Sequence, residues 1–321
     1  MKKFLAVFIS ALILVATLCA CGNNNNSVSN SDSDGKVKVV TTIFPPYDFT
    51  RQIGGENVDL TMLLKPGTES HNYDPTPQDI IKIQNCDLFI YVGGESDEWV
   101  NDILESNDSK PKKIISLMDC VDTVQEEIVE GMEKDEDEHE NDSHEIEYDE
   151  HVWTSPKNAI TITKKISSAL IELDSENEKL YEQNTTEYSR KLSILDNKFQ
   201  NIVDNAKRKT IIFGDRFPMR YFADEYGLKY YAAFPGCSSE TEPSAATVSF
   251  LIDKVKAEKI PVVFCIEFSN GKVADTICED TGAKKLTFHS CHNLTQEEFD
   301  SGVTYIDLMN QNAENIKEAL S

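Results

Sequence analysis

The sequence predicts an α/β fold with two lobes, each built on a parallel sheet, and a long rigid helix that joins them. Strand-like and helix-like segments alternate along most of the chain, which is typical of parallel sheets with helical crossovers. Residues 36–321 are too many for one ordinary core and sufficient for two. We therefore expect an amino-terminal lobe at 36–174, a linking helix at 175–206 and a carboxy-terminal lobe at 207–321.

The amino terminus has the pattern of a secretory signal peptide at 1–20. Two lysines precede the apolar run 4–18, which is too short to predict a spanning helix. The segment Leu-Cys-Ala-Cys that ends at Cys21 resembles a bacterial lipoprotein processing box, with cleavage before Cys21 and a lipid on its thiol. An uncleaved amino-terminal anchor is the alternative. The polar segment 21–35 then predicts a flexible tether, because it has too little apolar surface to fold.

In the first lobe, segments of alternating and continuous apolar character predict three strands separated by two helices. Thr76 and Asp79 flank Pro77 in the arrangement of a capped helix start. The expected strands are 36–43, 58–64 and 87–94, and the expected helices cover 47–53 and the residues after Pro77.

After the acidic segment 133–150, apolar residues recur at steps of three, four and seven between 175 and 205, which indicates one amphipathic helix. The second lobe repeats the strand and helix alternation of the first. Its expected strands are 209–214, 228–234, 261–268 and 284–289, and its expected helices are 218–226, 247–258, 272–281 and 312–320. Open parallel sheets bind ligands beyond the carboxyl ends of their strands, so we expect a site in the cleft between the lobes.

The net charge limits the classes of binding partner, whereas the cysteines leave the redox state of the chain open. A formal net charge of −25 argues against binding to nucleic acid or to an anionic membrane surface. Residues 133–150 contain eleven acidic residues and one lysine, a composition typical of a solvated loop. Six cysteines follow Cys21, and their spacing does not distinguish disulfides from free thiols. These are Cys86, Cys120, Cys237, Cys265, Cys278 and Cys291.

All six histidines lie beside carboxylates, a thiol or another histidine, which suggests that they bind a metal. A neutral imidazole is the commonest protein metal ligand near neutral pH. For any one of them, a surface position or a hydrogen-bonded core position is the alternative. The six are His71, His139, His144, His151, His289 and His292.

Several segments resemble the metal-binding lipoproteins that serve ATP-binding-cassette importers for zinc and manganese. The resemblance covers nearly the whole mature chain, and the segments together are far more specific than any one of them. They are TTIFPPYDFTRQIGGENVDLTMLLKPGTESHNYDPTPQDI, DEHVWTSP, RYFADEYGL, GCSSETEPS and EDTGAKKL. The resemblance implies a monomeric, extracytoplasmic binding protein, anchored through Cys21, that delivers its metal to a membrane permease driven by an ATPase.

The resemblance also implies a ligand set. His71 and His151 match the first two ligand positions of the family, but Arg216 occupies the third, and a guanidinium has no lone pair to offer. We expect Arg216 to shape the cleft wall by pairing with a carboxylate, such as Asp215 or Glu240. The fourth position falls at His289, and the candidates for the remaining place, in falling order, are His292, Cys291, Asp215 and Glu267.

The ligand types favour zinc over manganese, because nitrogen donors suit zinc and manganese prefers oxygen. The acidic segment with His139 and His144 resembles the histidine-rich loop of the zinc-type members and would raise the local metal concentration. Manganese transport or a metal-binding adhesin role in cell adhesion are the alternatives. A zinc hydrolase is disfavoured, since the chain has no His-Glu-x-x-His motif, nucleophile elbow or phosphate loop.

Overall fold

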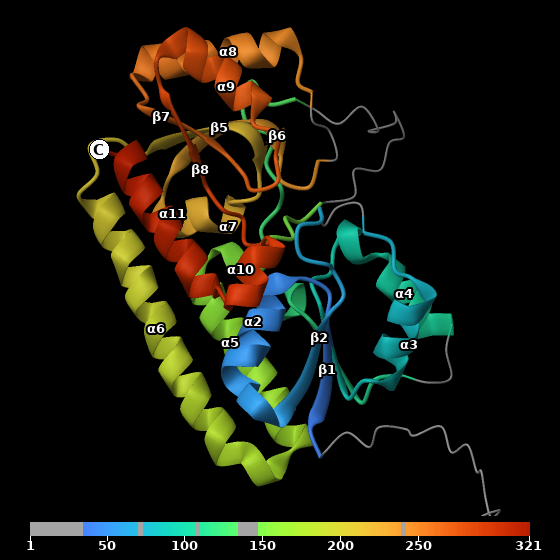
Figure 1. Ribbon diagram of the computed structural model, residues 1–321. Helices are drawn as coiled ribbons and strands as arrows, with labels where there is room; N and C mark the ends of the chain where they lie inside the picture. The colour runs from blue at the N-terminus through green and yellow to red at the C-terminus, as the bar shows by residue number, and fades with distance from the viewer. Residues whose placement is uncertain (1–34, 70–72, 107–109, 134–146, 239–241) are drawn as a thin grey trace, which may run out of the picture. The chain divides into compact units, whose positions relative to one another are not determined.

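The computed structural model describes residues 35–321, apart from 70–72, 107–109, 134–146 and 239–241 (Figure 1). Residues 36–321 form one compact unit. Within the described part of the chain, no helix is both long and apolar enough to cross a membrane. Several sequence predictions lie outside the described residues: the signal peptide, Cys21, the tether, His71, His139, His144 and Glu240.

The first lobe contains a four-stranded parallel sheet in the order β2-β1-β3-β4. Successive residues of a strand point to opposite faces, and both faces of this sheet are covered. Val39 packs on the face that α2 and α5 cover, whereas its neighbour Val40 packs with residues of α3 and α4. The elements are β1 (Val37–Thr41), α2 (Phe44–Gly54), β2 (Val58–Met62), α3 (Pro77–Asn85), β3 (Leu88–Tyr91), α4 (Trp99–Ser106) and β4 (Lys113–Ser116).

Two helix starts in this lobe show how local signals act. The predicted start of α3 is confirmed, since Thr76 and Asp79 form a capping box with Pro77 in the first turn. The predicted start of α2 at Tyr47 was wrong by three residues. The helix already begins at Phe44, because Pro45 and Pro46 fit the first turn, where a missing N–H costs nothing.

The second lobe repeats the same strand order, as β6-β5-β7-β8, again with parallel pairing. Helix α11 starts earlier than the predicted residue 312, because Thr304 and Asp307 form a capping box there. A short helix, α10, was not predicted. The elements are β5 (Thr210–Phe217), α7 (Arg220–Tyr226), β6 (Lys229–Pro235), α8 (Ala245–Glu258), β7 (Val262–Cys265), α9 (Lys272–Thr281), β8 (Lys284–Thr287), α10 (Gln296–Ser301) and α11 (Tyr305–Ala319).

Two long helices, α5 (Pro156–Leu173) and α6 (Glu178–Asp204), lie between these lobes in the sequence and pack on each other. The buried stripe of α6 includes Tyr188, whose hydroxyl donates to Asp48 on α2 of the first lobe. Lys198, nearly three turns further along α6, donates to Asn310 on α11 of the second lobe. In Figure 1, α6 runs beside α5 and α11, so the predicted long helix at 175–206 is confirmed, and it packs on helices on either side of it.

Both sheets place their topological switch point at equivalent strands, between β1 and β3 and between β5 and β7. Chain connections leave in opposite directions at such a point and open a crevice beyond the strand ends. The predicted fold class, two α/β lobes with parallel sheets, is confirmed. The loops that follow these strands are therefore where the site should be sought.

Candidate metal centre

His151 lies at the end of the first lobe, directly before a short turn, η4 (Val152–Thr154), that leads into α5. Its side chain is fully buried. Asp149 Oδ1 accepts a hydrogen bond from the His151 backbone N–H at 2.8 Å and lies 3.0 Å from its Nδ1. Because a carboxylate oxygen accepts, Nδ1 of the neutral ring carries the proton and Nε2 carries the lone pair. A carboxylate on the far ring nitrogen is the usual support of a metal-binding histidine.

The electrostatic surroundings of His151 favour a cation. Burial opposes the imidazolium, but the neighbouring carboxylates of Asp149, Glu150 and Glu126 outweigh it and raise the pKa of His151. Burial also raises the pKa of Glu126 to about 7, with Asp149 contributing. The same cause raises the pKa of Asp97 to about 7, against the lowering effect of hydrogen bonds from Val92 and Gly93. A divalent ion would compete with protons for this group of carboxylates and imidazole.

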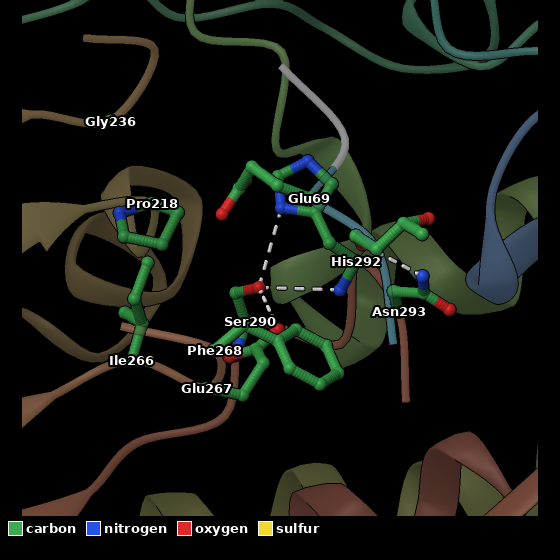
Figure 2. Close-up of a pocket in the computed structure, with 10 residues that line it drawn as sticks. Glu69, Pro218, Gly236, Ile266, Glu267, Phe268, Ser290, His292 and Asn293 are labelled. Carbon is green, nitrogen blue, oxygen red and sulfur yellow. Dashed lines mark hydrogen bonds between the residues drawn. The ribbon is translucent and has the colours of Figure 1, made fainter. Parts of the chain in front are cut away.

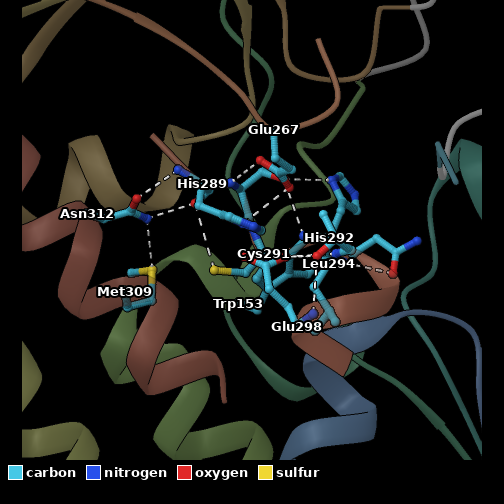
Figure 3. A network of polar contacts seen from close by, with 12 residues as sticks. Trp153, Glu267, His289, Cys291, His292, Leu294, Glu298, Met309 and Asn312 are labelled. Atoms are coloured by element: carbon cyan, nitrogen blue, oxygen red, sulfur yellow. Dashed lines mark hydrogen bonds and ion pairs between the residues drawn. The ribbon is translucent and has the colours of Figure 1, made fainter. Parts of the chain in front are cut away.

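His292 comes from the second lobe, in the loop between β8 and α10, and its ring meets the first-lobe residues (Figure 3). The ring centroid lies 4.7 Å from that of His151 and 4.7 Å from that of Trp153. Two hydrogen bonds hold the loop in place, from Trp153 Nε1 to Ser290 O at 2.8 Å and from Phe44 N to His292 O at 3.1 Å. The fold thus brings together one histidine from each lobe.

His289, three residues earlier, is held differently. Its Nδ1 accepts from the Cys291 backbone N–H at 2.9 Å, and its backbone N and O both bond to the Asn312 side chain. Glu267 Oε1 also lies 3.4 Å from this Nδ1, but the shorter contact comes from a donor, so the nitrogen acts as an acceptor. The ring proton of neutral His289 then lies on Nε2, which has no lone pair for an ion.

The other second-lobe candidates for metal ligands are either protonated more firmly by burial or already hold hydrogen bonds within the protein. Burial raises the pKa of the Cys291 thiol well above its usual value. Asp215 accepts through one oxygen from Arg216 N at 2.9 Å and through the other from Ile266 N at 3.3 Å. Both oxygens of Glu267 accept from Ser290, from its backbone N at 2.7 Å and from its hydroxyl.

Arg216 pairs with a carboxylate as expected, and among the described residues this partner is Glu69, whereas the proposed partner Glu240 lies outside them. Its Nη2 lies 3.0 Å from Glu69 Oε2, and its Nη1 donates to Ser238 O at 3.2 Å. The contact of Asp215 is with the Arg216 backbone instead. Glu69 was missed by the sequence reasoning, although its place two residues before His71 was a signal that it faces the cleft.

Two small cavities meet at His292, which lines both. The first is formed by loops that follow strands of the second lobe, together with Glu69, and Figure 2 shows Glu69 beside His292. The second is formed by loops that follow β1 and β3, with Asp97 and Glu150 in its wall. These are the strand ends at the two switch points, where the cleft was expected.

Gly236 makes a close approach to this site that a side chain would obstruct. A Cβ atom there would lie 2.9 Å from Phe217 O, 3.1 Å from His151 Cε1 and 3.2 Å from Asp149 Oδ2. Neither Gly236 nor Asp149 was singled out in the sequence, although Asp149 opens the segment that carries His151. Among the described residues, which leave out His71, no three His, Cys, Asp or Glu side chains form a group able to hold an ion.

Comparison with known proteins gives relatives over nearly the whole described chain. The high-affinity zinc uptake system protein ZnuA of Bacillus subtilis is 34% identical over 292 residues, which cover 89% of this chain and 88% of that protein. The zinc-binding lipoprotein AdcA of Streptococcus pneumoniae is 32% identical over 308 residues, covering 95% of this chain but 60% of AdcA. The crystal structure of the Zn(II)-bound ZnuA-like domain of that AdcA matches with a TM-score of 0.73 and 30% identity, covering 89% of this chain and 99% of the domain. The family model described as the periplasmic component A of the zinc-uptake complex matches residues 39–319, and the chain therefore belongs to the ZnuA family.

Proposed function

We propose that this protein captures zinc outside the cytoplasmic membrane and delivers it to the permease of an ATP-binding-cassette importer. Membership of the ZnuA family supports this role, as do the relatives named for zinc uptake and zinc binding. The observation that carries the proposal is the meeting of His151 and His292, whose rings come from different lobes and lie 4.7 Å apart. An ion held between them would contact both lobes at once.

We assign zinc to His71, His151 and His292, with a water or another side chain in the fourth place. Three nitrogen donors and one open position are a common zinc arrangement. His71 enters through its motif alone, since it lies outside the described residues. His289 was the earlier candidate and stays a prediction, but its hydrogen-bond network favours His292 as the ligand from this loop. Nitrogen donors favour zinc over manganese.

We also propose how the protein is anchored and with which proteins it works. The protein is anchored by a lipid on Cys21, acts as a monomer and carries out no catalysis. It works with a membrane permease and a cytoplasmic ATPase. The loop histidines His139 and His144 collect zinc near the cleft at low concentration.

The test is zinc content and competitive zinc affinity of the purified protein beside single alanine variants. We expect one tightly held zinc per chain, at least a hundredfold weaker binding in His151→Ala and His292→Ala, and nearly unchanged binding in His289→Ala. The last variant is the matched control, because it removes an imidazole from the same loop.

Two outcomes would count against the proposal in different ways. Loss of zinc in His289→Ala with retention in His292→Ala would move the ligand to His289 while leaving the transport role intact. Absence of bound zinc in the unmodified protein, or displacement of zinc by equimolar manganese, would overturn the zinc function itself.

A further inference from the structure

Two residues beside the proposed site join the strand ends of the second lobe. Glu267 follows β7 and Ser290 follows β8, and the Glu267 side chain is 9% exposed. Glu267 Oε2 accepts from the Ser290 backbone N–H at 2.7 Å, and Oε1 accepts from the Ser290 hydroxyl (Figure 2). Both oxygens of the carboxylate are therefore engaged by one serine.

The Ser290 hydroxyl also contacts His292 in two places. The His292 backbone N–H donates to Ser290 Oγ at 3.2 Å, and His292 Nδ1 lies 3.3 Å from the same oxygen. A hydroxyl has a single proton and two lone pairs. Since Ser290 gives its proton to Glu267, its oxygen can only accept from the imidazole. Nδ1 must then carry the ring proton, and the lone pair lies on Nε2.

Backbone conformation at these loops is unusual in a way that supports a fixed geometry. Among the described residues, three that are not glycine have positive φ, and two of them are Phe268 and Cys291. These directly follow Glu267 and Ser290. Residues other than glycine adopt positive φ only at a cost in free energy. Such a conformation persists where the surrounding contacts hold it in place.

We propose that Glu267 and Ser290 are positioning residues, which together set the proton on His292 Nδ1 and so leave its Nε2 lone pair for the metal. This inference rests on the proposed function, because it assumes His292 as a ligand. It makes the second-lobe histidine the counterpart of His151, whose Nδ1 is held by Asp149. In each lobe a carboxylate then orders one imidazole, directly for His151 and through a hydroxyl for His292.

The competing role for Glu267 is that of a direct metal ligand, which the sequence had suggested. To bind an ion, the carboxylate would have to release at least one of its two hydrogen bonds to Ser290. The two roles predict different effects of removing the serine hydroxyl. If Glu267 is a direct ligand, removing the hydroxyl frees its carboxylate to bind the ion. If Glu267 is a positioning residue, the same change breaks the chain of contacts from Glu267 through Ser290 to His292, which we call the relay.

The experiment measures the His292 tautomer and the zinc affinity in the same purified protein. With ¹⁵N-labelled histidine and no metal, long-range ¹H–¹⁵N spectra should show His292 protonated at Nδ1, the assignment coming from the spectrum of His292→Ala. In Ser290→Ala we expect the proton to shift toward Nε2 and zinc affinity to fall roughly tenfold. Ser290→Thr keeps the hydroxyl and should restore both, while Ser193→Ala on α6 serves as the control for serine removal.

Glu267→Gln separates the relay from direct ligation. We expect it to match Ser290→Ala in both readouts, with no further loss in the double variant, because both changes break one chain of contacts. An unchanged His292 tautomer in Ser290→Ala would overturn the inference, as would lost zinc binding in Glu267→Gln with full binding in Ser290→Ala. The tautomer readout needs no zinc, so the failure of the relay and the failure of the zinc function remain distinguishable.

Discussion

The guanidinium of Arg216 lies 3.0 Å from the carboxylate of Glu69, at the position where the sequence resemblance places a metal ligand. The Arg216 side chain is 8% exposed and that of Glu69 is 33% exposed. The chain thus holds a fixed cation in its cleft wall and neutralises it with a residue of the other lobe. Without that neutralisation, Arg216 would repel a divalent ion.

Because Arg216 is more deeply buried than Glu69, the two residues should contribute unequally to the free energy of unfolding. Glu69→Ala leaves a buried guanidinium without its carboxylate and should lower the free energy of unfolding by about 1–3 kcal/mol. Arg216→Met leaves Glu69 with access to water and should cost less. Denaturant unfolding of both variants checks the order. Glu187→Ala, from the exposed Glu187–Arg190 pair of α6, is the control and should change little. Equal losses in the two cleft variants would contradict this account of the pair.

Replacement of Asp149 should change the pH range over which zinc is held. Protonated His151 has no free lone pair, and Asp149 is the main group that raises the pKa of His151 against the effect of burial. In Asp149→Asn the pKa of His151 falls, so the loss of zinc on acidification should move to lower pH. Zinc titrations between about pH 5 and 8 measure the midpoint. Asp204→Asn, on the exposed end of α6, is the control, and an unmoved midpoint in Asp149→Asn would speak against the carboxylate's role.

Asp97 should make the fold less stable as pH rises through the acidic range. Burial raises the pKa of its carboxyl to about 7, whereas the carboxyl of the unfolded chain titrates near its ordinary value of about 4. Between these values the folded state binds more protons than the unfolded state, so the free energy of unfolding falls as pH increases. The contribution is at most roughly 4 kcal/mol, from about 1.4 kcal/mol per pH unit.

The test compares Asp97→Asn with the unmodified protein in denaturant unfolding at several values between pH 4 and 7. The difference in unfolding free energy between the two proteins should change across this window, because asparagine does not titrate. A constant difference would mean that Asp97 ionises normally in the folded state.

Gly236→Ala should weaken zinc binding at the site and also lower stability somewhat, because its Cβ would lie 2.9 Å from the backbone oxygen of Phe217. Its Cβ would lie 3.1 Å from His151 Cε1 and 3.2 Å from Asp149 Oδ2, so the ring and its carboxylate would have to move. We expect roughly a tenfold lower zinc affinity, the usual scale for disturbing a ligand's support. Competitive zinc titration provides the measurement, with thermal unfolding to confirm an intact fold. Full affinity in a folded variant would show that the imidazole tolerates the displacement.

Local signals in the sequence predicted several elements well. Thr76 and Asp79 mark the start of α3, because a capping box depends on residues three apart on one turn. The starts of α10 and α11 carry the same signal at Thr295 and Thr304, and it was overlooked at both. The start of α2 was predicted three residues too late, because Pro45 and Pro46 lie in the first turn of the helix and do not only mark the end of the preceding strand.

Site residues were predictable to the extent that their partners lie nearby in the sequence. His151 stands two residues from Asp149, which holds its ring, so one short motif contains both. The partner of Arg216 could not be found in this way, because Glu69 lies far away in the other lobe. The choice between His289 and His292 depended on contacts with Cys291, Asn312 and Trp153, two of which come from distant segments.

The sequence by itself determined the two α/β lobes, the extracytoplasmic metal-binding family and the histidines available for a metal, because periodicity and short motifs are local properties of the chain. Only the tertiary structure decided which second-lobe histidine meets His151 and which groups contact the nitrogens of each ring. The physical reason is that a ring nitrogen's role is set by its hydrogen-bond partner. For His292 that partner, Ser290, is itself ordered by Glu267 from a different strand end.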